Sequence, residues 1–195
     1  MEGDSRGPKG LRLLLLGAPG SGKGTQASAL SSRLCVPAIS TGEMLREAVA
    51  EGSELGERIS GLLASGELVD DATMRQVVQR RLDKPDTERG FMLDGYPRTI
   101  DQAHALDEIL SSSGEGLDAA IQIEVPEEEL VRRALARRRE DDREDIVRRR
   151  LAVYRDKTRP VAEFYRDRGL LVEVDGDQPI VRVTEAILSA LGVAA

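Results

Sequence analysis

The sequence is poor in the residues that build disulfides, metal clusters and membrane spans. It holds one cysteine and one histidine in 195 residues, which excludes an internal disulfide and a cysteine-based metal site. A single cysteine suits a reducing compartment. The apolar run Leu11–Leu16 contains Arg12 and ends at Gly17, so it is too short to cross a bilayer or to serve as a secretory signal. We therefore expect a cytoplasmic protein without a membrane partner.

Positive charge is also in deficit. The chain has 28 basic and 35 acidic residues, a formal net charge of -7, whereas nucleic-acid binders usually have a basic balance. We expect no nucleic-acid partner. Apolar residues make up 40% of the chain, and the length is enough for one substantial core. Residues 1–10 hold three glycines and one proline without apolar periodicity, so we expect a disordered leader followed by a single domain over 11–195.

Short apolar segments alternate with longer amphipathic ones. Four have strand length and no polar alternation, which predicts strands buried on both faces: Leu11–Leu16, Gly90–Leu93, Ala119–Val125 and Leu170–Val174. The segment Pro37–Ile39 is a candidate for a further strand. The expected helices cover Gly24–Leu34, Gly42–Glu51, Asp71–Leu82, Glu127–Arg138, Glu144–Arg168 and Ile180–Leu191. This alternation predicts an α/β fold, a parallel sheet with helices on both faces.

A glycine-rich segment follows the first expected strand. Residues 17–25 have the sequence GAPGSGKGT, which fits the spacing GxxxxGK between a strand and a helix. Such glycines turn backbone N–H groups toward phosphate oxygens, and the helix N-terminus adds its own. Lys23 would reach the terminal phosphates as a point charge. Because Gly24 stands where Ser or Thr is usual, Thr25 cannot be given the usual magnesium role.

The variant GxPGxGKGT is typical of the nucleoside monophosphate kinases, and further motifs of that family follow in order. Residues 40–46 (STGEMLR) resemble its STGDMLR segment, and residues 66–69 (GELV) resemble GxLV. Residues 91–98 (FMLDGYPR) resemble the adenylate kinase signature, with Gln102 at the family spacing. Residues 139–142 (REDD) resemble RxDD, and 150–154 (RLAVY) resemble RLxxY. The resemblance covers nearly the whole chain.

The resemblance implies a P-loop NTPase-type sheet with a small NMP-binding flap, residues 40–69, and a short lid, residues 136–142. Only one residue separates Arg137 from Arg139, which leaves no room for the long lid with its sometimes cysteine-bound zinc. It also implies reversible transfer of the terminal phosphate of ATP to AMP, giving two ADP. The implied cofactor is Mg²⁺ bound with ATP, and no zinc is expected.

The family's site residues carry over onto matching positions. The ATP phosphates would be held by Gly20, Ser21, Gly22, Lys23, Gly24 and Thr25, with Arg133 and Arg137 approaching from the lid and Gly176 beside the adenine. The AMP phosphate would be held by Arg46 and Arg98, with Arg139 and Arg150 spanning the transferred group. The rest of the AMP site would comprise Thr41, Glu67, Leu68, Val69, Gly95, Tyr96, Pro97 and Gln102. Asp94 would orient Mg²⁺ through water, without direct protein ligands.

The chemistry itself calls for cations. An acceptor phosphate is already anionic, so it needs no general base, only positive charge that holds two repelling phosphate groups in line. Nine arginines fall between positions 132 and 150. Arg133 and Arg137 would share a helical face, and Arg139 and Arg150 would do so if the helix were continuous. Interleaved acidic residues favour surface roles for Arg132, Arg138, Arg143, Arg148 and Arg149.

Alternative functions are weighed against particular residues. A UMP or CMP kinase is the nearest, but Thr41, Gln102 and the Thr99 that follows Pro-Arg are typical of AMP-directed members. A guanine-specific switch and a protein kinase both need an asparagine, and the sequence has none. A non-catalytic binding module would be expected to have lost Lys23 or an arginine. A monomer is expected because no spare apolar helix remains.

A few residues are given structural roles only. His104 is expected on a helix surface and Cys35 in the core. Packing roles are expected for Tyr154, Phe164 and Tyr165.

Overall fold

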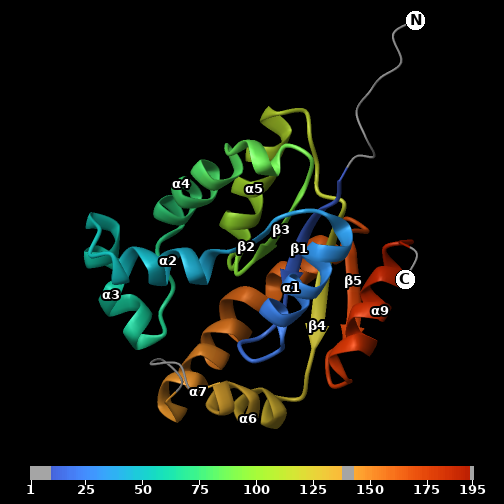
Figure 1. Ribbon diagram of the computed structural model, residues 1–195. Helices are drawn as coiled ribbons and strands as arrows, with labels where there is room; N and C mark the ends of the chain where they lie inside the picture. The colour runs from blue at the N-terminus through green and yellow to red at the C-terminus, as the bar shows by residue number, and fades with distance from the viewer. Residues whose placement is uncertain (1–9, 138–142, 194–195) are drawn as a thin grey trace, which may run out of the picture.

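The computed structural model describes residues 10–137 and 143–193 and contains a parallel five-stranded sheet with helices on both faces (Figure 1). The strand order is β2-β3-β1-β4-β5. The strands are β1 (Arg12–Leu16), β2 (Ala38–Ser40), β3 (Phe91–Asp94), β4 (Ala119–Glu124) and β5 (Leu171–Asp175). The predicted fold class is confirmed, and all five strands fall within a residue or two of their predicted positions.

Helices fill the connections between the strands. They are α1 (Lys23–Leu34), α2 (Thr41–Ala50), α3 (Glu54–Ser65), α4 (Asp71–Leu82), α5 (Ile100–Ser112), α6 (Glu127–Arg137), α7 (Glu144–Val153), α8 (Arg159–Arg166) and α9 (Ile180–Ala190). A 3₁₀ turn, η1, covers Pro85–Thr87, and a π-helical segment, η2, covers Tyr154–Thr158. No helix among the described residues is both long and apolar enough to span a membrane.

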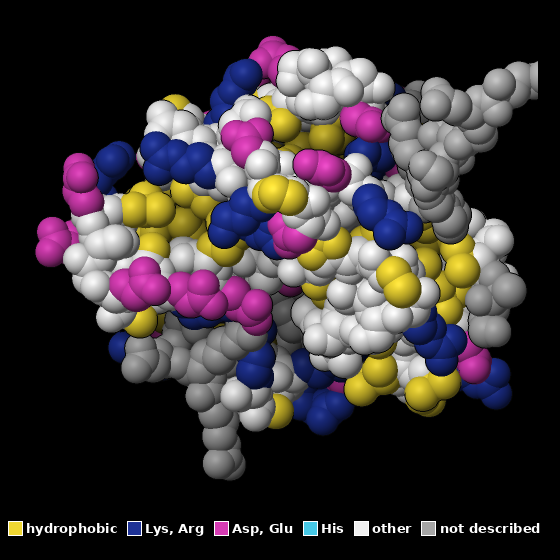
Figure 2. Space-filling view, turned by 45° about the horizontal axis from the view of Figure 1, so that its top comes forward, with side chains coloured by type: hydrophobic (Ala, Val, Ile, Leu, Met, Phe, Trp, Pro, Cys, Tyr) yellow, Lys and Arg dark blue, Asp and Glu magenta, His cyan; other side chains and the backbone are white. Residues whose placement is uncertain are grey.

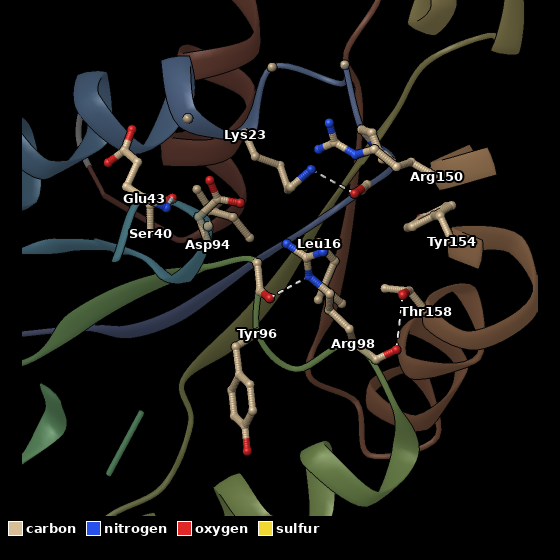
Figure 3. A pocket seen from close by; sticks show the side chains of 18 of the residues that line it. Leu16, Lys23, Ser40, Glu43, Asp94, Tyr96, Arg98, Arg150, Tyr154 and Thr158 are labelled. Atoms are coloured by element: carbon tan, nitrogen blue, oxygen red, sulfur yellow. Dashed lines mark hydrogen bonds between the residues drawn. The ribbon is translucent and has the colours of Figure 1, made fainter. Parts of the chain in front are cut away.

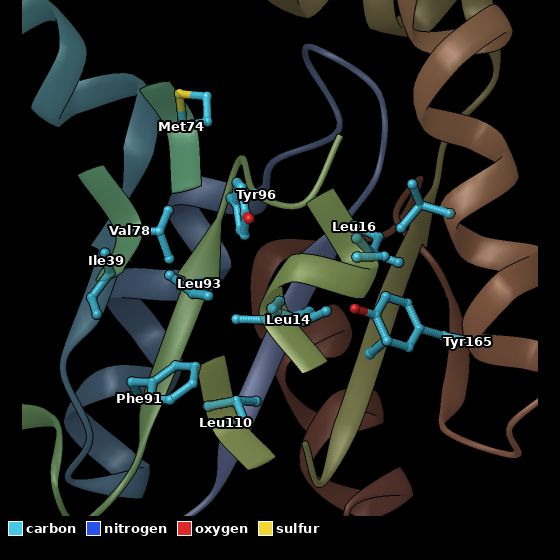
Figure 4. Packing of buried hydrophobic residues seen from close by; sticks show 14 of the residues in the cluster. Leu14, Leu16, Ile39, Met74, Val78, Phe91, Leu93, Tyr96, Leu110 and Tyr165 are labelled. Carbon is cyan, nitrogen blue, oxygen red and sulfur yellow. The ribbon is translucent and has the colours of Figure 1, made fainter. Parts of the chain in front are cut away.

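The central strand β1 supplies side chains to two separate cores. Leu14 and Leu16 pack into the cluster that contains residues of α5 and α8, shown in Figure 4. Leu13 and Leu15 point to the opposite face, where α1 and α9 complete a second cluster. Alternate side chains of a strand face opposite sides, so a run of apolar residues is what a sheet covered on both faces requires.

Burial differs between central and edge strands. Strands β1, β3 and β4 are buried almost throughout, as predicted. The prediction that Leu170–Val174 is buried on both faces is wrong, because β5 is an edge strand that pairs only with β4 and leaves Glu173 exposed. Edge strands have one neighbour and correspondingly more contact with solvent.

Two helical predictions need correction. The expected single helix Glu144–Arg168 is interrupted by the π-helical segment Tyr154–Thr158 and ends at Arg166. Pro160 lies in the first turn of α8 and has no N–H to donate to the preceding turn, so the regular hydrogen-bond ladder cannot continue there. The helix α3 was not predicted.

The predicted structural roles are mostly confirmed. His104 is exposed on α5 and meets the ring of Phe164 edge-on, with centroids 5.0 Å apart. Tyr165 is completely buried. Cys35 is not in the core: it is exposed and ends α1 with a left-handed backbone, φ 53°. A left-handed residue commonly ends a helix, so Cys35 lies past the last turn of α1 and outside its buried face.

Candidate functional site

A cleft of about 620 Å³ lies at the carboxyl ends of the strands. Its lining includes Leu16 at the end of β1, Ser40 at the end of β2 and Asp94 at the end of β3 (Figure 3). Parallel strands end at the same edge of a sheet, which is where open α/β folds place ligands. A smaller cavity of about 60 Å³ shares Arg46, Arg98 and other lining residues with the cleft.

The loop between β1 and α1 has the geometry predicted for an anion site. Gly20 and Gly22 have left-handed backbone, with φ values of 92° and 94°. A Cβ on Gly20 would lie 2.6 Å from the carbonyl oxygen of Leu130, so only glycine fits there. The first backbone hydrogen bond of α1 runs from Gln26 N–H to Gly22 O, at 3.0 Å. The N–H groups at the start of α1, up to Thr25, therefore have no partner within the helix.

Lys23 lies over this loop. Its Nζ atom donates to the carbonyl oxygens of Gly17, at 2.8 Å, and Ala18, at 3.0 Å. Burial lowers the pKa of Lys23 to about 8; the nearby Asp94 opposes this change, and the positive charges of Arg98, Arg150 and Arg137 add to it. Several cations are thus held close enough to affect one another.

Arg98 is held in place by three contacts of different kinds. Its Nε atom donates to the carbonyl oxygen of Gly95 at 2.8 Å, and its backbone N–H donates to Oε1 of Gln102 at 2.7 Å. Its own carbonyl accepts a hydrogen bond from the Thr158 hydroxyl at 3.0 Å. Burial lowers the pKa of Arg98, and the neighbouring Arg150 lowers it further.

The smaller cavity contains most of the residues expected around the second nucleotide. Thr41 is buried and donates its hydroxyl to the carbonyl oxygen of Asp94 at 3.2 Å. The smaller cavity is lined by residues that include Thr41, Arg46, Glu67, Leu68, Val69, Gly95, Arg98, Gln102 and Arg150. Tyr96 and Pro97 line the larger cleft, where Tyr96 is anchored in the core and burial raises its pKa to about 12.

Arg133 on α6 also lines the cleft. This side chain donates to the carbonyl oxygen of Gly176 and to Oδ1 of Asp177, both at 2.9 Å, and also bonds Glu129. Gly176 is buried against β4: a Cβ there would lie 2.4 Å from Cγ2 of Ile123. Close packing against the neighbouring strand therefore requires glycine at this position, independently of the expected contact with the adenine of ATP.

The expected lid lies mostly outside the described residues. Arg137 is exposed and lines the cleft, whereas Arg139 falls in the segment 138–142 that the structure does not describe. The condition for Arg139 and Arg150 to share a face of one helix is not met, because Arg143 has extended backbone with φ −77° and ψ 145°. The surface roles expected for other arginines are confirmed for Arg132, Arg143, Arg148 and Arg149, all exposed.

Some residues that shape the site were not predicted. Asp71, on α4, accepts hydrogen bonds from Gln102 and Thr99. Thr158 holds Arg98 as described above. Tyr154, expected only to pack, lines the cleft, and its hydroxyl accepts from Nε2 of Gln122 at 2.8 Å. Only Tyr154 carried a sequence signal, since it belongs to the RLAVY segment.

Comparison with known proteins identifies similar chains. A family model described as adenylate kinase matches residues 15–170. An adenylate kinase of Xylella fastidiosa is 48% identical over 186 residues, with 93% of this chain and 100% of that protein covered. One of Xanthomonas euvesicatoria is 49% identical with the same coverage. One of Moorella thermoacetica is 45% identical over 213 residues, with 93% of this chain and 98% of that protein covered.

Proposed function

The chain belongs to the adenylate kinase family, in its short-lid form, and from this premise we propose how its cleft works. The enzyme transfers the terminal phosphate of ATP reversibly to AMP, giving two ADP. A UMP or CMP kinase, and a non-catalytic nucleotide switch, find no support over this function in the relatives, which are named adenylate kinases. The roles of single residues below are our proposal.

The observation that carries the proposal is the gathering of cations in one cleft of an acidic protein. Six cations come from separate parts of the chain and line the same cleft: Lys23, Arg46, Arg98, Arg133, Arg137 and Arg150. The face shown in Figure 2, by contrast, carries acidic and basic side chains interspersed. Such a concentration of positive charge suits two polyphosphate chains, whose mutual repulsion is the main obstacle to in-line transfer.

ATP binds along the loop between β1 and α1 in this proposal. Residues Gly20–Thr25 surround the β- and γ-phosphates, largely through backbone N–H groups at the start of α1, and Lys23 leaves the carbonyls of Gly17 and Ala18 to contact them. Phosphate oxygens offer that ammonium a charged partner, which a carbonyl does not. Arg133 and Arg137 contact ATP from the lid side, and the Gly176 backbone lies next to the base.

AMP binds across the smaller cavity and the adjoining part of the cleft, which share Arg46, Arg98 and Arg150. Arg46 and Arg98 hold its phosphate, with Arg139 and Arg150 spanning the group in transfer. The base and sugar lie among Thr41, Glu67, Leu68, Val69 and Gln102. The fixed backbone of Arg98, bonded to both Gln102 and Thr158, keeps the guanidinium where the acceptor oxygen must arrive.

Magnesium fits this site only as an ion carried by the nucleotide. Within residues 10–137 and 143–193 no group of three His, Cys, Asp or Glu side chains is placed to hold a metal. Asp94 is half-buried in the cleft wall and faces the start of α1: a Cβ on Gly24 would lie 3.9 Å from its Oδ2. Asp94 would therefore orient water molecules of a hydrated Mg²⁺, which when bound supplies charge neutralisation between the phosphates.

Closure around both nucleotides is part of the proposal. The flap, residues 40–69, and the short lid, residues 136–142, exclude water so that transfer to AMP outcompetes hydrolysis. We also propose that the enzyme acts as a monomer in the cytoplasm.

A steady-state assay with ATP and Mg²⁺ tests the function. The chain is offered AMP, dAMP, CMP and UMP in turn, and we expect AMP to give the highest kcat/KM. Turnover of UMP at a rate comparable with AMP would overturn the choice of acceptor. The variant R98K serves as a check on the site, because lysine lacks the planar fork that holds a phosphate bidentately, and we expect kcat/KM for AMP to fall by about two orders of magnitude.

A further inference from the structure

The side-chain amide of Gln102 is held in one orientation by two neighbours, one a hydrogen-bond donor and the other an acceptor. Oε1 accepts from the backbone N–H of Arg98 at 2.7 Å, and Nε2 donates to Oδ1 of Asp71, also at 2.7 Å. A backbone N–H can only donate, and an ionised carboxylate can only accept. Turning the amide by 180° would place oxygen against carboxylate and NH₂ against N–H, so that both contacts become repulsive.

Asp71 is itself fixed. It occupies the first turn of α4, and its second oxygen accepts from the Thr99 hydroxyl at 3.1 Å. Thr99 in turn caps α5 by accepting from Gln102 N–H at 3.1 Å. Asp71 lines neither cavity, whereas Gln102 lines the smaller one. Gln102 therefore gives Asp71 a direct contact with a residue that lines the cavity.

We propose that Asp71 is a positioning residue that makes Gln102 select bases with an amino group beside an unprotonated ring nitrogen. With one Nε2 hydrogen used by Asp71, the other remains to donate toward the cavity, and Oε1 keeps a lone pair beside it. Adenine matches this edge, because N1 accepts and the 6-amino group donates. Hypoxanthine has a donor N1–H and a keto oxygen, so it requires the amide to be turned over. This inference rests on the proposed function and deepens it.

The same hydrogen-bonding pattern distinguishes cytosine from uracil. Cytosine has an acceptor N3 beside an amino group, as adenine does, whereas uracil has N3–H beside a keto oxygen. The locked amide therefore rejects IMP and UMP for the same reason, and CMP for its smaller size alone. A buried donor that faces another donor, or an acceptor that faces another acceptor, costs more free energy than a missing hydrogen bond. The fixed orientation of the Gln102 amide therefore discriminates against IMP and UMP more strongly than the loss of a hydrogen bond would.

The first test compares D71N with the matched variant D70N. An asparagine at position 71 can present either oxygen or NH₂ to Gln102, so the lock is relaxed. Asp70 instead caps α4 by accepting from Thr73 N–H at 2.8 Å, and asparagine preserves such a cap. For D71N we expect the preference for AMP over IMP, as a ratio of kcat/KM values, to fall about tenfold, mostly through KM. For D70N, and for the KM of ATP in both variants, we expect changes below about twofold.

The second test exchanges the two functional groups in the double variant D71N/Q102E. The asparagine NH₂ introduced at position 71 can donate to the carboxylate introduced at position 102, so a hydrogen bond and the net charge are retained. The side chain at position 102 then offers only acceptors to the base. We expect IMP binding to strengthen relative to AMP, measured by calorimetric titration as well as by kcat/KM. This variant keeps the proposal testable if D71N alone folds poorly.

These experiments distinguish failure of the Asp71 role from failure of the proposed adenylate kinase activity. If the unaltered chain fails to phosphorylate AMP, the proposed function fails. If it phosphorylates AMP but D71N keeps the full AMP-to-IMP ratio, or the double variant prefers AMP as strongly as the unaltered chain, Asp71 has only a structural role and the inference is overturned.

Discussion

The ammonium group of Lys23 lies 2.8 Å from the carbonyl oxygen of Gly17, six residues earlier in the chain. The lysine thus folds back over its own loop, and it donates hydrogen bonds to the neutral carbonyls of Gly17 and Ala18. A buried cation with neutral partners is poorly compensated, and the pKa of about 8 expresses this.

The first prediction concerns the pH dependence of the reaction. Lys23 must be protonated to contact phosphates, so we expect kcat/KM for ATP to fall as the pH rises through about 8. Bound phosphates favour the charged lysine and raise its pKa, so the fall in kcat should occur at higher pH. The measurement is a pair of pH profiles between about pH 6 and pH 10. The K23R variant, which stays protonated, should be less active but lack this fall; an unchanged profile would contradict the assignment.

A second prediction follows for stability. The folded-state pKa of Lys23, about 8, lies below the ordinary value of 10.5, so between these pH values the unfolded chain binds more protons and stability rises with pH. Below pH 8 the folded protein carries the full cost of the buried charge. We expect K23M to be inactive yet more stable at pH 7 by about 1–2 kcal/mol, less than full conversion of the pKa difference because the half-buried side chain still meets solvent.

Chemical denaturation at about pH 7 and about pH 10 measures the difference in unfolding free energy between K23M and the unaltered chain. The stability gain should shrink toward zero at the higher pH, where Lys23 is neutral in the folded protein. A variant that is destabilised equally at both pH values would show that packing, and not charge, dominates at this position.

A third prediction concerns Thr158, whose hydroxyl donates to the carbonyl of Arg98 at 3.0 Å across 60 residues of sequence. Replacing it by valine keeps the shape and removes the donor. We expect T158V to lower kcat by about threefold to tenfold, since a lost hydrogen bond of about 1 kcal/mol lets Arg98 drift from the acceptor phosphate. T158S should retain near-normal kcat, and equal activity of T158V and the unaltered enzyme would refute the role.

The fourth prediction concerns Gly176. A Cβ here would lie 2.4 Å from Ile123 Cγ2 and 2.7 Å from Val125 Cγ2, so the loop after β5 must move outward in G176A. We expect a loss of about 1–3 kcal/mol in unfolding free energy, as overpacking typically costs. Because Arg133 bonds the Gly176 carbonyl, KM for ATP should rise as well. The control is G116A, where a Cβ meets open space and the φ angle is not left-handed.

What the sequence predicted well is local. The segment from Leu13 to Thr25 specifies a buried strand, a glycine loop and a helix start through neighbouring residues alone, and the structure has all three. The helix α3 was missed although it carries local signals: Ser53 caps it through Gly56 N–H, and Gly66 ends it with left-handed backbone. Both features are helix-boundary signals that a sequence carries locally.

What the sequence could not predict depends on contacts between distant segments. The hydrogen bond from Gln102 to Asp71 crosses 31 residues and exists only because α4 and α5 pack together. Thr158, the last residue of the π-helical segment, donates to the carbonyl of Arg98 across 60 residues of sequence. The partial exposure of β5 follows from its place at the edge of the sheet. The residues of a single strand do not determine the order of the strands in the sheet.

The way helices α2 and α3 are joined to the sheet has a consequence for how such enzymes diverge. The chain enters this pair after Ser40, which caps α2, and leaves it before Asp70, which caps α4. At each junction the side chain of the N-cap residue caps the helix that follows, so the stretch between the two junctions is a locally bounded insertion. Residues between these junctions can vary while the phosphate loop and the buried strands stay unaltered, provided that Arg46, which lines the cleft from α2, is kept.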